Sequence, residues 1–309
     1  MLTAALRAFF LWLSNRRWVA RLALGVPLLR RMPLRFVAGT TLNEAVTAVR
    51  ALNAGGAMAT LDVLGESVHD RASADRAASA YVQAIERIAA EGLDANVSIK
   101  LTQMGLDMGV DECISVLAPV VDAGRRHGIF IRIDMESSAY TDATLEVVHR
   151  LRADGSEIGP AVQSYLHRSP GDVEPLAADR VRTRVCKGAY LEGPDAAHQD
   201  RAAISDAFVA LCERLLDADA YPGAATHDPD VIRRVTAAAR TRGVAADRFE
   251  LQMLYGIRRD LQRQLLARGY RLRVYVPYGT EWYPYFMRRL AERPANVLFV
   301  LRSVLGERS

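Results

Sequence analysis

From residue 58 onward, short apolar runs rich in β-branched residues alternate with longer segments in which apolar residues recur at helical spacing. Two of the helical segments, RASADRAASAYVQAIERIAAEG (71–92) and DPDVIRRVTAAARTRG (228–243), end in a glycine, which is typical of helix C-termini. The apolar runs predict eight strands, and these lie at residues 59–66, 96–102, 129–136, 160–166, 182–188, 223–228, 249–256 and 273–279.

Eight strands joined by long helical connections indicate parallel pairing, because parallel neighbours need a crossover. Eight parallel strands can close into a (β/α)8 barrel, the TIM barrel. An open doubly wound sheet is the competing fold, but it usually carries a GxGxxG turn, and this pattern does not occur in the sequence. The predicted fold class is therefore α/β, of the TIM-barrel type with extra N-terminal helices.

Charge is distributed unevenly along the chain. The net charge is +4, but residues 1–43 hold seven arginines and no acid, which leaves the rest of the chain with a net charge of −3. The basic character is thus local, and it gives little support to a nucleic-acid-binding function.

The N-terminal segment mixes arginines with large apolar residues. Its uncharged runs are far shorter than the roughly 20 residues that a membrane-spanning helix needs. Arginines interleaved with Phe9, Phe10, Trp12 and Trp18 are typical of an amphipathic helix at a membrane interface, and a helix that caps the core is the alternative. A cleaved signal is less favoured, because the apolar stretch FFLWL is short. We therefore expect a helical arm over residues 1–40 and a barrel domain over residues 41–309.

Cysteine and histidine patterns predict neither a disulfide framework nor a metal site. Cys113, Cys186 and Cys212 form no CxxC pair, which favours reduced thiols in a reducing compartment. The six histidines form no HxxxH or HExxH pair.

Polar residues gather at the C-terminal ends of the predicted strands, where barrel enzymes assemble their active sites. Lys100 and Asp134 lie within apolar runs, where a charge is costly unless it is paired. They could form a structural ion pair inside the barrel or a pair that faces a ligand. Gln163 needs a partner with donor and acceptor groups, such as a flavin edge, a purine edge or backbone. The other polar residues at these ends are Glu66, Glu136, Lys187, Thr226, His227, Tyr255 and Tyr275.

The run TRVCKGAY combines an interior cation with a glycine turn. Arg184 is interior by alternation with Arg182, and it precedes Lys187 and Gly188. Backbone N–H groups and one cation suit a phosphate, although such turns are also common at ordinary strand ends.

The run THD ends the sixth predicted strand. Asp228 is expected to cap the following helix, with Pro229 at its first position. Thr226 and His227 could face a cofactor, but the pattern alone does not decide this.

The run YFMRRLAE, residues 285–292, raises the possibility of an anion clamp. Glu292 lies within one helical turn of both Arg288 and Arg289 and can steady one guanidinium. Tyr285 and Trp282 are nearby aromatics of the kind that line small-ligand pockets. Spacing alone leaves open either a solvated surface helix or a clamp for a carboxylate or phosphate.

Several of these runs occur in one order and together resemble the monofunctional proline dehydrogenase family, the flavoenzymes of proline catabolism. The resemblance covers roughly residues 40 to 300, and RVCKGAY and YFMRRLAE are its most specific blocks. The other matching runs are VSIKLTQMGLD, IRIDMES, AATHD and FELQMLYG.

The resemblance implies a distorted (β/α)8 barrel with FAD at the C-terminal ends of the strands. The implied reaction oxidises L-proline to Δ1-pyrroline-5-carboxylate by hydride transfer to the flavin, and a membrane quinone then reoxidises the flavin. The alternatives are another FAD-binding barrel oxidoreductase, the same reaction on hydroxyproline, and a catalytically silent membrane-bound module.

The resemblance also implies roles for individual residues. Lys100, Arg288 and Arg289 would hold the substrate carboxylate, and Glu292 would orient the clamp. Tyr275 and Tyr285 would flank the proline ring. Asp134 and Arg184 match catalytic positions, and Arg184 would also lie near the flavin ring. The other implied FAD contacts are Met135, Gln163, Lys187, Gly188, Ala189, Thr226 and His227, with Tyr190 and Glu66 in matching motifs.

One residue departs from the family pattern. Asp228 stands where the family often has asparagine after Thr-His, and a carboxylate would repel a pyrophosphate, so we leave it out of the FAD site. An enzyme that reduces a lipid-soluble quinone fits the basic N-terminal arm. We expect a cytoplasmic protein that binds peripherally to the inner face of the cell membrane through residues 1–35.

Overall fold

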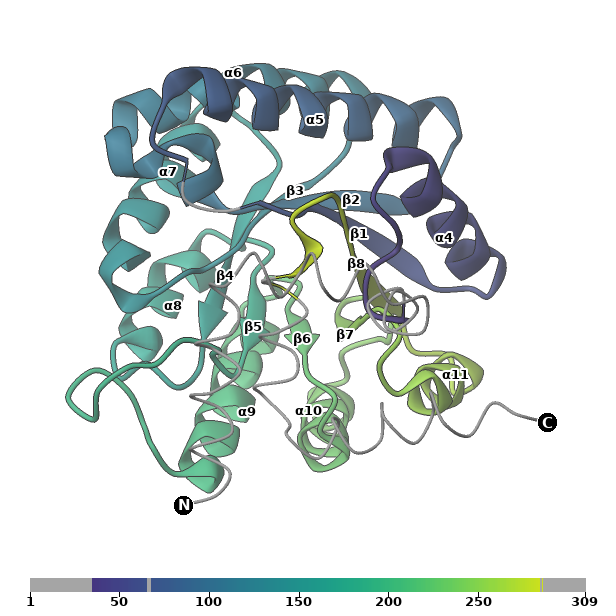
Figure 1. Cartoon of the computed structure of the whole chain (residues 1–309). Coiled ribbons are helices and arrows are strands. Elements are labelled where there is room, and N and C mark those ends of the chain that lie inside the picture. The colour runs from purple at the N-terminus through teal and green to yellow at the C-terminus, as the bar shows by residue number, and fades with distance from the viewer. Residues whose placement is uncertain (1–34, 66–67, 284, 286–309) are drawn as a thin grey trace.

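Eight parallel strands close into a barrel in which every strand pairs with its neighbours in the sequence (Figure 1). This computed structural model describes residues 35–65, 68–283 and 285. The predicted TIM barrel is confirmed. The strands are β1 (Met58–Val63), β2 (Ala95–Ile99), β3 (Ile131–Ile133), β4 (Ile158–Gln163), β5 (Arg184–Cys186), β6 (Gly223–Ala225), β7 (Glu250–Leu254) and β8 (Leu272–Tyr278).

Helices surround the barrel, and several begin at a capping side chain, of which the sequence analysis predicted Asp228. Thr41 and Glu44 form a capping box at the start of α4, and Asp70, Asp200 and Asp228 accept backbone N–H groups at the starts of α5, α9 and α10. The helices are α4 (Leu42–Ala54), α5 (Arg71–Ala90), α6 (Val110–His127), α7 (Thr141–Ala153), α8 (Ser169–Ala178), α9 (Arg201–Asp217), α10 (Pro229–Thr241) and α11 (Arg259–Ala267), with short 3₁₀ turns η2 (Leu101–Met104), η3 (Leu106–Met108) and η4 (Ser138–Tyr140).

The barrel closes where its first and last strands meet. β1 pairs with β8 over six residues, from Met58 opposite Arg273 to Val63 opposite Tyr278. The extra N-terminal helix α4 packs against both strands at this seam. None of the helices among the described residues is both long and apolar enough to span a bilayer.

Hydrophobic residues form a shell between the sheet and the helices. Leu61, Val97, Ile99 and Val274 are fully buried on the outward side of their strands. Alternate residues point the other way, into the barrel, and many of these are polar. They include Thr60, Asp62, Asn96, Ser98, Arg132, Arg184, Glu250, Gln252, Arg273 and Tyr275.

This polar filling differs from the branched apolar layers that usually fill such barrels. Hydrogen bonds between strands that are not neighbours demonstrate the inward direction, since they can only cross the interior. Arg184 on β5, for example, bonds with Ser98 on β2 and with Gln252 on β7. Gly223 on β6 leaves room for this layer, because a Cβ there would lie 2.4 Å from the Gln252 amide nitrogen.

Strand boundaries differ from the predicted ones mainly at the C-terminal ends. The third run was expected over residues 129–136, and β3 covers only Ile131–Ile133. Beyond it the chain leaves the ladder, and Glu136 accepts hydrogen bonds from the backbone and hydroxyl of Thr102. The apolar pattern thus continues past the point where polar side-chain contacts replace strand pairing.

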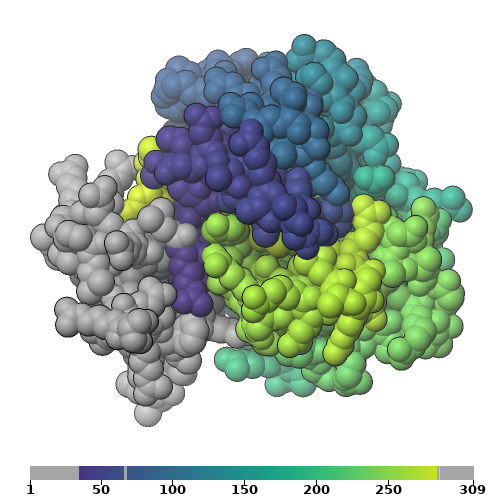
Figure 2. Space-filling view, turned by 90° about the vertical axis from the view of Figure 1, so that its right-hand side faces the viewer, coloured from purple at the N-terminus to yellow at the C-terminus, as the bar shows by residue number. Residues whose placement is uncertain are grey.

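A shallow surface pocket of about 500 Å³ lies between the ends of α4 and α11, which Figure 2 shows side by side. Its lining includes Gly55, Arg263, Tyr270 and Arg271. Gly55, Tyr270 and Arg271 lie just before β1 and β8 begin, so the pocket is at the N-terminal end of the barrel. Catalysis in barrel enzymes takes place at the other end, and the pocket is therefore not the candidate active site.

Candidate active site

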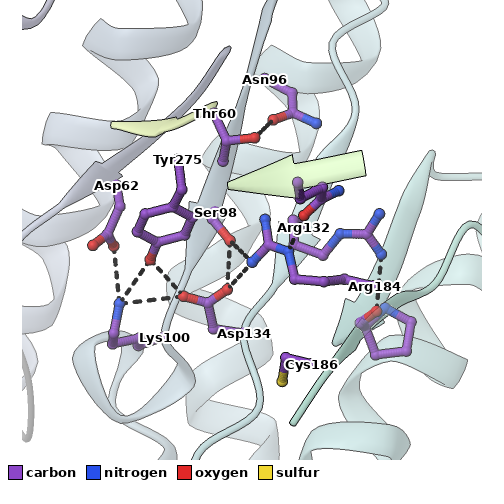
Figure 3. A network of polar contacts seen from close by, with 12 residues as sticks. Thr60, Asp62, Asn96, Ser98, Lys100, Arg132, Asp134, Arg184, Cys186 and Tyr275 are labelled. Atoms are coloured by element: carbon purple, nitrogen blue, oxygen red, sulfur yellow. Dashed lines mark hydrogen bonds and ion pairs between the residues drawn. The ribbon is translucent and has the colours of Figure 1, made fainter. Parts of the chain in front are cut away.

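The Asp134 carboxylate, just after β3, is the centre of a polar network at the C-terminal end of the barrel (Figure 3). Its Oδ1 accepts hydrogen bonds from Ser98 Oγ and Arg184 Nη1, both at 2.6 Å. Its Oδ2 accepts from Tyr275 OH at 2.8 Å and from Lys100 Nζ at 3.2 Å. Burial alone would raise the pKa of Asp134, but Lys100 and Arg184 outweigh it and lower the pKa to about 2. Asp134 is therefore ionised at neutral pH.

The Lys100 ammonium, directly after β2, has an acceptor for each of its three N–H groups. Nζ lies 3.0 Å from Asp62 Oδ1, 3.2 Å from Asp134 Oδ2 and 3.2 Å from Tyr275 OH. Burial would lower the pKa of Lys100, but the two carboxylates raise it well above its ordinary value. The side chains of Lys100 and Asp134 are each 13% exposed. The two residues therefore form the structural ion pair that the sequence allowed, while each keeps some surface open to a ligand.

Arg184 connects this network to the far side of the barrel. Its Nε donates to Gln252 Oε1 at 2.6 Å, and its guanidinium carbon lies 5.3 Å from the centre of the Tyr275 ring. Gln252 in turn donates to Glu250, which accepts from Arg273 Nε at 2.8 Å. The Arg184 side chain is held from both sides and cannot turn without breaking several hydrogen bonds.

Sequence reasoning did not identify three members of the network, namely Asp62, Ser98 and Gln252. Asp62 is fully buried on β1, and its signal was available as a charged residue inside the apolar run ATLDVLG. Ser98 and Gln252 are common polar residues in strands, and only the closed barrel brings them to Arg184.

A second group of predicted residues lies at the ends of β4, β5 and β6. Lys187 Nζ donates to Ser205 Oγ at 2.9 Å and to Asp228 Oδ2 at 2.7 Å, and its side chain is 32% exposed. The other Asp228 oxygen accepts from the Asp230 N–H at 3.1 Å and caps α10. The predicted capping role of Asp228 is confirmed, and the carboxylate also pairs with the cation that the sequence assigned to a phosphate.

Buried amide and hydroxyl groups hold the neighbouring backbone. Gln163 Nε2 donates to the Glu136 carbonyl at 2.7 Å, so its amide binds the backbone that follows Met135. Thr226 Oγ1 accepts from the Asp228 N–H at 3.1 Å. His227 Nε2 lies 2.9 Å from the Leu254 N–H, so this ring nitrogen is an acceptor. In this structure, part of the polar capacity of Gln163, Thr226 and His227 is directed to the protein itself.

Gly188, which is half-buried, has a backbone conformation that a larger residue could not adopt without strain. Its φ is +111°, and a Cβ would lie 2.3 Å from the Tyr165 ring. The following residue, Ala189, is exposed. The chain thus comes to the surface at Ala189, two residues after Lys187.

The expected carboxylate clamp is only partly within the described residues. Tyr275 belongs to the network, and Tyr285 is 6% exposed. Arg288, Arg289, Glu292 and Glu66 lie outside the residues that the structure describes.

The thiols and metal-ligating side chains provide no second centre. Burial raises the pKa of Cys113 to about 12 and of Cys186 to about 11, and it also raises the pKa of Cys212. Within the described ranges, no three His, Cys, Asp or Glu side chains are grouped so that they could hold a metal ion.

A family model described as proline dehydrogenase matches residues 45–302. The chain belongs to the proline dehydrogenase family. Its activity is accordingly that of an oxidoreductase that oxidises proline, the first step of proline catabolism.

Curated relatives of similar length agree with this membership. The chain is 37% identical to proline dehydrogenase 1 of Bacillus subtilis subsp. natto over 302 residues, which covers 97% of this chain and 99% of that protein. It is 41% identical to the proline dehydrogenase of Deinococcus radiodurans over 276 residues, which covers 88% of this chain and 89% of that protein.

Solved structures support the fold. Proline utilization A from Bdellovibrio bacteriovorus, inactivated by N-propargylglycine, matches with a TM-score of 0.82 over 91% of this chain at 22% identity. The chain covers 34% of that protein, about a third of its length.

Proposed function

We propose that this proline dehydrogenase is FAD-dependent, converts L-proline to Δ1-pyrroline-5-carboxylate and passes the electrons to a membrane quinone. The main support is the Lys100–Asp134–Arg184 network at the C-terminal end of a closed barrel, which is where barrel enzymes bind their substrates. The network offers fixed cations and no activated nucleophile. This suits a reaction that depends on orientation and exclusion of water.

The residues at the ends of β4, β5 and β6 suit a flavin dinucleotide. Lys187 supplies a partly exposed cation, the Gly188 turn allows backbone to approach a phosphate, and Gln163 supplies a buried amide. The remaining proposed contacts are Met135, Arg184, Ala189, Thr226 and His227. When bound, the flavin accepts the hydride that leaves the proline carbon next to nitrogen. Asp228 competes with the dinucleotide for Lys187, because it already binds this ammonium.

Lys100, Arg288 and Arg289 are the proposed ligands of the proline carboxylate, with Glu292 orienting the arginines. All three N–H groups of Lys100 already have acceptors, so a carboxylate must displace one of them. Tyr275 and Tyr285 are proposed to flank the ring. Asp134 and Arg184 are proposed to act by holding Lys100 and Tyr275 in place, since they bond directly to this pair or stack on it.

Absorbance of the purified protein before and after anaerobic L-proline tests this proposal directly. A flavin band that bleaches is the expected result. A flavin band that persists would contradict the proposal that proline is the substrate, but would support the proposal that FAD is the cofactor. Folded protein without flavin would contradict the cofactor.

The clamp can be tested separately with Arg289→Met. This change removes a charge-assisted contact to the carboxylate that contributes about 1.5–3 kcal/mol, so KM for proline should rise by about one to two orders of magnitude while flavin stays bound. Arg240→Met, at the exposed end of α10, is a matched control that should leave KM unchanged. Unchanged KM in Arg289→Met would rule out the clamp.

The membrane proposal concerns residues 1–35, which are basic and rich in aromatic residues. We propose that they bind peripherally to the inner face of the cell membrane, with the barrel in the cytoplasm. Deleting them should abolish co-sedimentation with anionic liposomes and spare proline oxidation with a soluble dye acceptor. Liposome binding that survives the deletion would contradict this role.

A further inference from the structure

Asp62 is a buried carboxylate with an incomplete set of partners. It lies on β1 and is fully buried. Oδ1 accepts from Lys100 Nζ at 3.0 Å and lies 3.4 Å from Tyr81 OH, whereas no described residue donates a hydrogen bond to the buried Oδ2. A buried carboxylate oxygen without a donor costs free energy, so a purely structural residue at this position would be expected to bond with both oxygens.

The titratable groups around Asp62 come from three strand ends and one helix. Burial raises the pKa of Asp62, the Lys100 ammonium opposes this, and the Asp134 carboxylate adds to it. Tyr81 on α5 lies near the carboxylate, and Tyr275 on β8, which also contacts Lys100, acts directly on Asp62 and lowers its pKa. Tyr278 is the further ionisable group whose pKa Asp62 raises, after burial. Of the two carboxylates that bind Lys100, Asp62 is thus the one whose surroundings favour the protonated form.

Proline oxidation needs a group of this kind. The nitrogen lone pair must be free to form the C=N bond as hydride leaves the carbon, yet a secondary ammonium keeps its proton up to about the pKa of 10.4 typical of alkyl ammonium ions such as lysine. Asp134 is a weak acceptor, because its pKa is lowered to about 2. Lys100 alone is also a weak acceptor, because it is already charged.

We propose that Asp62 is a positioning residue that holds Lys100 and, through it, takes up the proton that the substrate ammonium releases. Lys100 Nζ gives a proton to Asp62 Oδ1, and its freed lone pair accepts one N–H proton of proline. Lys100 ends as it began, Asp62 becomes a neutral acid, and proline becomes a neutral amine. No electrons move in this step, and the proton returns to solvent after the product leaves.

The exposure of the two side chains supports these roles, in which Lys100 contacts the substrate and Asp62 takes up the proton. Asp62 is fully buried and cannot touch a ligand, whereas the Lys100 side chain is 13% exposed. The inference rests on proline being the substrate, and on no detail of the electron acceptor.

The test compares Asp62→Asn with Thr60→Val over about pH 6 to 10. Asparagine keeps the size and one acceptor for Lys100 but is too weak a base. Thr60 is also buried, two residues earlier on the same side of β1, and bonds to Asn96 rather than to Lys100. Product formation is followed with a soluble dye acceptor, and thermal unfolding of each variant confirms folding.

We expect kcat in Asp62→Asn to fall by about 100-fold at pH 7, the usual contribution of a general base, with KM little changed. The deficit should shrink to less than about tenfold near pH 10, where solution already supplies neutral proline amine. The kcat of Thr60→Val should be the same fraction of the wild-type kcat at every pH.

If kcat of Asp62→Asn is reduced by the same factor at every pH, or is not reduced at all, the inference is wrong. The proposed function still stands in that case, provided that the wild-type protein oxidises proline. A wild-type protein that leaves proline unoxidised would overturn both. If Asp62→Asn does not fold, Asp62→Ser, which is smaller and equally unable to hold the proton, is judged by the same pH profile.

Discussion

At the scale of single residues, the site is built around carboxylates that each serve more than one cation. Asp134 binds both Lys100 and Arg184, and Asp62 shares Lys100 with it. Such groups depend on one another, because removing one partner leaves a buried charge uncompensated. Their positions are therefore set by the whole network.

Arg184→Gln should destabilise the protein by about 3–5 kcal/mol, since it leaves Asp134 short of a cation and breaks the bond to Gln252. Arg214→Gln is the matched control, because it breaks an exposed ion pair with Glu174 and should change stability little. Urea unfolding of both variants measures the difference. Equal effects of the two substitutions would show that the network contributes no more than a surface pair.

The sequence allowed part of this network to be predicted. Lys100, Asp134 and Arg184 were identifiable because a charge within an apolar run demands a partner. Ser98 and Gln252 were not, since neutral polar residues are ordinary in strands and gain a role only through contacts across the barrel. The partner of Lys187 was also not predicted, because Asp228 was assigned to the helix cap alone.

At the scale of elements, the pattern predicted all eight strands but overestimated the length of the shortest ones. β3 and β5 are each three residues long, although apolar alternation extends further. Strand length depends on pairing with neighbours, and pairing ends where the chain bends into the site. The start of α10 was predictable, because the Asp228 cap acts on the backbone next to it.

Asp228, at the start of α10, both caps the helix and pairs with Lys187, and two substitutions can separate these roles. Asp228→Asn keeps an N-cap side chain and should leave stability nearly unchanged, whereas Asp228→Ala should cost about 0.5–2 kcal/mol. Asp228→Asn also frees Lys187 from its carboxylate partner, so we expect tighter binding of the proposed flavin dinucleotide. Thermal unfolding and flavin titration of the apoprotein measure these effects, and weaker binding in Asp228→Asn would argue against the placement of Lys187 at a phosphate.

At the scale of the whole molecule, the number and spacing of the strands were enough to predict a closed barrel. The sequence placed Arg184 in the interior and allowed a Lys100–Asp134 pair there, but the extent of the polar interior was not predicted, because alternation shows that two faces differ without showing which one points inward. Only closure decides this, and it places Arg132, Arg184, Glu250 and Arg273 together inside the sheet.

This interior should make the fold sensitive to acid. The pKa of Asp134 is lowered to about 2, and that of Glu250 is lowered because Arg273 and Arg132 outweigh the effect of burial. Unfolded carboxyl groups titrate near pH 4, so the stabilisation is complete above about pH 4 and is lost as the pH falls toward about 2. The pKa of Asp62 is raised, so this carboxyl group has the opposite effect and lowers the free energy of unfolding as the pH rises.

Urea unfolding between pH 7 and about pH 3 should therefore show a falling free energy of unfolding below about pH 4. Asp134→Asn should reduce this dependence, because it removes the carboxyl group that titrates. A free energy of unfolding that is flat over this range in the wild type would contradict the assignment.

The polar filling of the barrel also implies a conflict between robustness and activity. Replacing a buried ionic network as a whole by apolar side chains of similar volume is often neutral or stabilising. A barrel refilled with valine, isoleucine and leucine at the inward positions could therefore outlast the natural one and catalyse nothing. Selection for heat resistance alone would drift toward such inert barrels, so a search for hardier variants of this enzyme should vary the outer shell and leave the inward layer unchanged.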